Sequence, residues 1–100
     1  MIKVEVVSNK SIIKEVNLLG HAMYDDYGKD IVCSAVSSIV ITTVNGIIKL
    51  DKDAIRYKQD SKGLYIEVLK SNTIINTLMC NMIDLLKELE NDYPKNIIVK

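Results

Sequence analysis

Residues 30–50 read DIVCSAVSSIVITTVNGIIKL, and this stretch decides the fold. Its apolar side chains, placed at helical spacing, cover most of the circumference of a helix. A helix that is apolar nearly all round is a buried helix. The β-branched residues would also suit a strand, but about twenty residues is too long for one. We therefore expect a central, buried helix that begins at Asp30 and ends near Leu50, or near residue 45 if Gly46 weakens its last turns.

The segments on both sides of this helix alternate between apolar and polar residues, as half-buried strands do. Four segments show this alternation: residues 2–8, 12–19, 54–60 and 64–69. A short polar turn joins the members of each pair, which predicts two antiparallel hairpins. A second helix with one apolar stripe is predicted to follow an N-cap at Asn72 or Ser71 and to end near Asn91, and a short strand over 96–99 follows Pro94. The predicted fold class is α+β: a mostly antiparallel sheet with two helices packed on it, one of them central and buried.

Length and charge exclude several classes of protein. The chain has 100 residues, 48% of them apolar and 26% charged, so we expect a single domain over residues 1–100. Its 13 basic and 13 acidic side chains cancel, which predicts no direct nucleic-acid binding and no attraction to an anionic membrane. We also expect no apolar run of the roughly 18–20 residues that a membrane-spanning helix needs.

The cysteine and histidine content bears on metals and on location. Two cysteines and one histidine are too few for a structural zinc site in one chain, so we expect no metal and no cofactor. The N-terminal residues alternate like a strand and do not resemble a signal peptide. Thiols without a secretory segment are typical of a reducing compartment, so the expected location is the cytoplasm.

The periodic pattern stops between Gly20 and Lys29. This segment is polar, contains a second glycine at Gly28, and holds the one histidine of the chain together with Tyr24 and Tyr27. A polar, glycine-bounded segment of this length predicts a surface loop, and such loops carry function more often than packing. The two tyrosines are either ordinary loop surface or side chains that close over an extended peptide.

Cys33 and His21 form the one nucleophile–base pair that the chain offers. If Asp30 is the N-cap, Cys33 is the third helical residue, where backbone N–H groups without partners favour a thiolate and could hold an oxyanion. A carboxylate at Asp30 raises the pKa of a nearby thiol, and an imidazolium at His21 lowers it again. We therefore predict a thiolate–imidazolium pair, with Asp30 as a candidate third member that orients the ring.

Each of these residues also has a structural interpretation. Cys33 could be a small residue of the apolar core, and His21 could serve only as a hydrogen-bonding group. Asp30 is first of all a helix cap. Ser37 lies one helical turn after Cys33 and either bonds back to the Cys33 carbonyl or supports the thiolate or the substrate. Cys80 lies on the second helix, away from any base, and is interpreted as structural.

Two blocks of sequence carry a resemblance: Gly20-His21-Ala22, and Gly28-Lys29-Asp30-Ile31-Val32-Cys33-Ser34-Ala35-Val36-Ser37. Together they resemble the Prp family, the ribosomal-processing cysteine proteases of bacteria, and the resemblance covers nearly the whole chain. It implies that Cys33 and His21 are the catalytic pair and that Asp30 and Ser37 support them. The residue after the cysteine is commonly alanine in that family, whereas here it is a serine. We assign substrate contacts to Gly20, Tyr24, Tyr27 and Ser34.

The resemblance also implies an activity and partners. Such proteases remove an N-terminal extension from large-subunit ribosomal protein twenty-seven, act as homodimers, and have a mobile loop between the histidine and the cysteine. The expected chemistry is peptide hydrolysis through an acyl-enzyme, with no metal and no cofactor. The alternative, from another class, is a non-enzymatic ribosome-associated adaptor whose cysteine is inert.

Overall fold

The computed structural model describes residues 1–20 and 27–100, with the side chains of residues 1–20 and 31–100. Seven elements follow one another along this part of the chain: β1 (Ile2–Asn9), β2 (Ile12–Leu19), α1 (Tyr27–Leu50), β3 (Ile55–Asp60), β4 (Gly63–Val68), α2 (Thr73–Asp92) and β5 (Ile97–Val99). Their order is the predicted one. The alternation of apolar and polar residues placed all four long strands, because one face of each strand is buried and the other is not.

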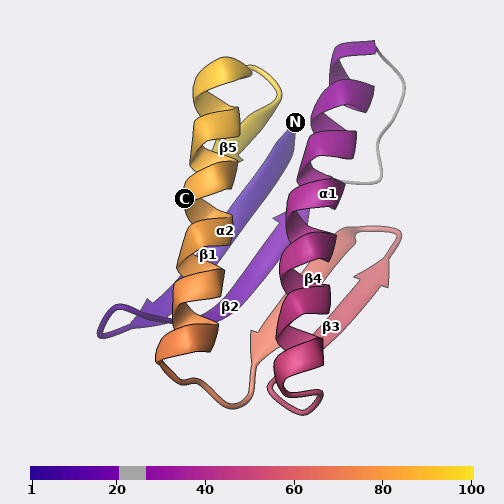
Figure 1. Cartoon of the computed structure of the whole chain (residues 1–100). Helices are drawn as coiled ribbons and strands as arrows, with labels where there is room; N and C mark the ends of the chain where they lie inside the picture. The colour runs from indigo at the N-terminus through magenta and orange to yellow at the C-terminus, as the bar shows by residue number, and fades with distance from the viewer. Residues whose placement is uncertain (21–26) are drawn as a thin grey trace.

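The strands form one sheet in the order β3-β4-β2-β1-β5. β1 pairs with β2, β2 with β4 and β3 with β4 in antiparallel fashion. β5 instead runs parallel to β1, because α2 carries the chain back across the sheet before β5 begins. Both helices lie side by side on the same face of the sheet (Figure 1). The predicted α+β class is confirmed, with one parallel pair at the edge.

The core lies between the helices and this face of the sheet. Alternate strand residues fill it, among them Val4, Val16, Leu18, Leu64 and Ile66. From α2 it receives Ile75, Met79, Met82, Ile83 and Leu86. These positions follow the spacing that brings one side of a helix against a neighbour. The opposite face of the sheet carries mostly charged and polar residues.

α1 buries only one stripe of its surface. The prediction that this helix is buried nearly all round is therefore correct for one side only. The stripe consists of Val32, Val36, Val40, Val44 and Ile47. On the other sides of the helix Ile31 remains 55% exposed, Ile41 37% and Ile48 40%. The two helices share one layer, so the sheet lies under α1 and α2 lies beside it (Figure 1). In the described part of this single chain, nothing covers the side of α1 that faces away from the sheet.

The predicted end of α1 near Leu50 is confirmed, and the alternative end near residue 45 is wrong. Val44 and Ile47, on either side of Gly46, are buried and hold the helix against the sheet. The expectation that no apolar run is long enough to span a membrane is wrong. The residues Ile31–Leu50 also have a mean hydropathy of 2.0, which by length and composition is enough to cross a membrane. Serine, threonine and asparagine interrupt this stretch, and its one charged residue is Lys49. The core helix of a folded domain passes the same test.

Candidate active site

α1 begins three residues earlier than predicted, at Tyr27. Asp30 is therefore the fourth helical residue and not the N-cap, which corrects that prediction. An N-cap needs a non-helical backbone, and the helical backbone already runs through residues 27–29. Cys33 becomes the seventh residue of α1. Only the first four N–H groups of a helix lack partners within it, so the N–H of Cys33 is not one of the predicted oxyanion donors.

Cys33 lies on the flank of α1, between the buried stripe and solvent. It is partly buried and packs against the core. Ser37 is also partly buried and lies one turn further along the same side of the helix. The next residue after Cys33, Ser34, is exposed. A side chain held by a core helix, yet reachable from one side, is a suitable place for a nucleophile.

Gly20 directly follows β2 and has a backbone conformation that few other residues adopt. Its φ is +80°, and a Cβ there would lie 2.6 Å from the carbonyl oxygen of Met1. The Gly20 N–H donates a hydrogen bond of 3.1 Å to the carbonyl of Lys62, in the turn between β3 and β4. The substrate contact assigned to Gly20 stays a prediction. The contacts of Gly20 with Met1 and Lys62 were not predicted, because nothing in the sequence marks contacts between such distant residues.

Several predicted site residues lie outside the described part of the structure. His21 and Tyr24 belong to residues 21–26, which the structure does not describe. The backbones of Tyr27 and Asp30 belong to α1, but the structure does not describe their side chains. The pairing of His21 with Cys33, the role of Asp30 and the substrate contacts of the two tyrosines therefore stay predictions.

The second cysteine, Cys80, lies on α2 and packs against the core from that helix. It borders a shallow pocket of about 230 Å³ whose lining includes Val6, Ile83 and Lys87. Among the described residues, no group of three or more histidine, cysteine, aspartate or glutamate side chains could hold a metal ion.

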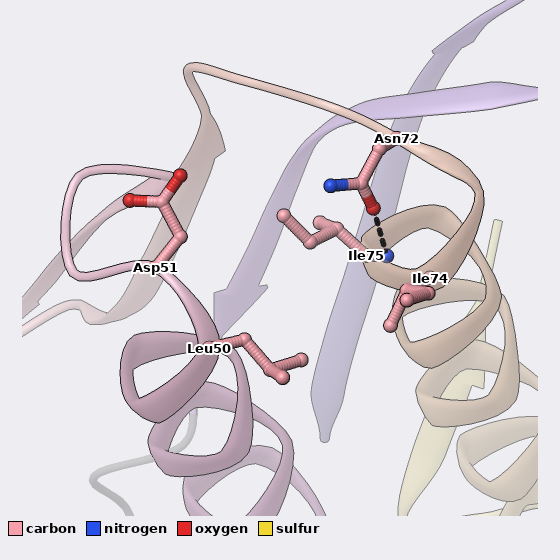
Figure 2. A pocket seen from close by; sticks show the side chains of 5 residues that line it. All are labelled: Leu50, Asp51, Asn72, Ile74 and Ile75. Carbon is pink, nitrogen blue, oxygen red and sulfur yellow. Dashed lines mark hydrogen bonds between the residues drawn. The ribbon is translucent and has the colours of Figure 1, made fainter.

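A larger pocket lies at the far end of α1 from Cys33. It has a volume of about 300 Å³ and is lined by Leu50, Asp51, Asn72, Ile74 and Ile75 (Figure 2). Leu50 is seventeen residues after Cys33 on the same helix, which places it about 25 Å away along the helix axis. This pocket is therefore not part of the candidate active site.

Two tyrosines have shifted acidities. Burial raises the pKa of Tyr57, whose hydroxyl is buried on β3 without a hydrogen-bond partner in the described structure. A hydrogen bond to Glu15 is the main cause that raises the pKa of Tyr65 to about 12. Tyr65 lies on β4, and its partners Glu15 and Glu67 are paired residues of β2 and β4. This polar cluster lies on the sheet and includes neither Cys33 nor Gly20.

The sequence matches the model of the family described as Cysteine protease Prp over residues 1–98. A relative from Staphylococcus aureus, named Ribosomal processing cysteine protease Prp, is 29% identical over 97% of this chain and 95% of its own length. The solved structure of the essential ribosomal processing protease Prp of that organism with a substrate peptide matches all of this chain and 98% of its own, with a TM-score of 0.90 and 28% identity. A second structure, with a covalently linked product peptide, has the same coverage and identity and a TM-score of 0.87.

Proposed function

This chain belongs to the Prp family of cysteine proteases, and from that premise we propose that it removes the N-terminal extension of large-subunit ribosomal protein twenty-seven. The chain is a cysteine protease. The observation that carries the proposal is the match of its whole fold to a relative crystallised with a substrate peptide, with a TM-score of 0.90.

Cys33 and His21 carry out the chemistry in this proposal. The Cys33 thiolate attacks the scissile carbonyl carbon while His21 holds the thiol proton. His21 gives that proton to the leaving amine as the C–N bond breaks, which leaves a thioester on Cys33. His21 then takes a proton from water as the hydroxide attacks the thioester carbon. The C–S bond breaks, the peptide acid leaves, and the Cys33 thiolate is regenerated beside the protonated His21. The relative with a covalently linked product peptide supports a covalent step.

The other predicted residues act around this pair. Ser37 supports the thiolate from one helical turn away, and Asp30 orients the imidazole. Gly20, Tyr24, Tyr27 and Ser34 contact the substrate. Because the net charge of the chain is zero, shape and backbone hydrogen bonds contribute more to recognition than electrostatic steering does.

The protein acts as a homodimer in this proposal, joined through the side of α1 that faces away from the sheet. This surface contains Ile31, Ile41 and Ile48, each more than one-third exposed. No charged residue occurs between Ile31 and Ile48, although exposed helix faces are usually charged. Interfaces between identical subunits are depleted in charge in the same way. The location is the cytoplasm, where such a substrate would be available.

The test is cleavage of the ribosomal protein precursor by the purified protein, followed by mass spectrometry. The wild-type chain should shorten the precursor at one bond. Cys33→Ala should reduce cleavage by at least about 10³-fold and still bind the precursor, whereas Cys80→Ala, the matched control, should cleave at the wild-type rate. Alkylation should also be much faster at Cys33 than at Cys80. Cleavage by Cys33→Ala, or equal and slow alkylation of both thiols, would instead favour the adaptor.

A further inference from the structure

We propose that Asp60 is a positioning residue for the protease reaction, because its carboxylate shapes the turn that holds the residue before His21. The inference rests on the proposed function, since it takes His21 as the general base. It concerns Asp60 at the end of β3 and Lys62 in the following turn, together with Gly20, which directly follows β2 and is about forty residues earlier in the sequence.

The carboxylate of Asp60 organises the turn from within. Its Oδ1 accepts the backbone N–H of Lys62 at 2.8 Å and the N–H of Gly63 at 3.2 Å. The Gly63 N–H belongs to the peptide unit between Lys62 and Gly63, and the Lys62 N–H to the unit before it, so the carboxylate holds both units of the turn, as aspartates in turns commonly do. The carbonyl of the unit between Lys62 and Gly63 is that of Lys62, so the Asp60 side chain determines where that oxygen points.

The Lys62 carbonyl in turn fixes Gly20. It accepts the Gly20 N–H at 3.1 Å. Space requires a glycine there, because a Cβ would lie 2.6 Å from the Met1 carbonyl. Glycine is also the residue with the most backbone freedom. The hydrogen bond to the Lys62 carbonyl therefore restrains the backbone of Gly20, which has no side chain to do so.

Gly63, the first residue of β4, brings the hairpin and β2 even closer together. Gly63 pairs with Leu19, and a Cβ on Gly63 would overlap the carbonyl oxygen of Leu18. Movement of the turn is thus transmitted directly to the last residues of β2. His21 follows Gly20 in the sequence, so the direction in which the chain leaves β2 depends on the turn that Asp60 holds. A general base works only within hydrogen-bond reach of its proton, and small displacements are costly in rate.

The experiment compares Asp60 with Asp51, because the carboxylate of each accepts a backbone N–H within its own connecting segment. Asp51 Oδ1 accepts the N–H of Asp53 at 2.9 Å in the connection between α1 and β3, next to the pocket at the far end of α1 (Figure 2). Asp60→Ala should lower kcat about tenfold and leave KM within about twofold. Asp60→Asn keeps an oxygen acceptor and should restore kcat to within about twofold of the wild type. Asp51→Ala should leave kcat and KM unchanged.

A second measurement tests the hydrogen bond between the Gly20 N–H and the Lys62 carbonyl directly. Hydrogen exchange of the Gly20 amide should be faster in Asp60→Ala than in the wild type and in Asp51→Ala, because this amide loses a well-placed acceptor. The proposal is overturned if Asp60→Ala keeps the wild-type kcat, if Asp60→Asn fails to rescue, or if Asp51→Ala shows the same loss. Failure of the proposed function looks different: Cys33→Ala would then cleave, while the Gly20 exchange would still respond to Asp60.

Discussion

The hydroxyl of Tyr65 donates a hydrogen bond of 2.7 Å to Oε1 of Glu15, across the antiparallel strands β4 and β2. Tyr65 is directly opposite Asn17, so Glu15 is its diagonal neighbour, at a distance that a tyrosine can span. The hydrogen bond, then burial, then repulsion from Glu15 and Glu67 raise the pKa of Tyr65 to about 12, and Arg56 acts in the opposite sense. The network therefore stabilises the protonated phenol.

We expect this network to make stability fall in alkali. The pKa of Tyr65 is 10.0 without these interactions and about 12 in the fold. The native state therefore holds a proton that the unfolded chain loses between these values, so the contribution is complete below pH 10 and disappears as the pH rises towards 12. Urea unfolding of the wild type and of Tyr65→Phe should show a stability difference that shrinks over this range. A difference that stays constant with pH would contradict the assignment, and ultraviolet titration of the tyrosinate band gives an independent check.

Gly63→Ala and Gly46→Ala should change stability in opposite directions. A Cβ on Gly63 would overlap the Leu18 carbonyl, and the φ of +149° is unfavourable for alanine, so we expect a loss of about 3 kcal/mol. A Cβ on Gly46 meets nothing within 4 Å and extends a regular helix, so alanine should add about 0.5–1 kcal/mol. Chemical denaturation measures both. Equal effects of the two substitutions would contradict this difference in backbone environment.

The sequence predicted what depends on local pattern. Val16 and Leu18 alternate with polar neighbours because their strand has one buried face, and the spacing of Met79, Met82 and Leu86 follows one side of a helix. The Cys33 block was found because its residue types and order resemble those of a protease family. These features depend on residues that are close in the sequence, so they could be predicted without the fold.

Features that depend on distant contacts could not be predicted. The parallel pairing of Ile2 with Ile97 joins the two ends of the chain, and the tie between Gly20 and Lys62 joins two separate hairpins. The start of α1 was misplaced for another reason: aspartate is a favoured N-cap residue, but it is also tolerated inside a helix, and here the helical backbone extends beyond Asp30 to Tyr27. The apolar side of α1 that is exposed was predicted to be buried. The sequence shows that this side is apolar, but it does not show whether another part of the protein covers it.

Asn72 should stabilise α2 as its N-cap. Its backbone is extended and its Oδ1 accepts the N–H of Ile75 at 2.9 Å (Figure 2). Asn72→Ala removes this acceptor and should lower the free energy of unfolding by about 1 kcal/mol, whereas Asn72→Asp, which keeps an acceptor, should cost much less. Asn91→Ala, at an exposed position in the last turn of α2, is the control and should change stability little. Thermal or urea unfolding measures the change in stability of each variant. Equal losses of stability from Asn72→Ala and Asn91→Ala would contradict the role of Asn72 as an N-cap.

The outer side of α1 gives the last prediction, because it tests the proposed homodimer directly. Ile41 is 37% exposed on a helix face without charge, and Leu85 is 39% exposed on α2. A lysine in place of Ile41 would bring an unpaired charge into the proposed interface, and burying such a charge is costly. Light scattering should give the wild type twice its chain mass of 11.3 kDa and Ile41→Lys the mass of one chain. Leu85→Lys, equally exposed but outside the interface, should remain dimeric; a dimer that survives Ile41→Lys and dissociates with Leu85→Lys would place the interface on α2 instead.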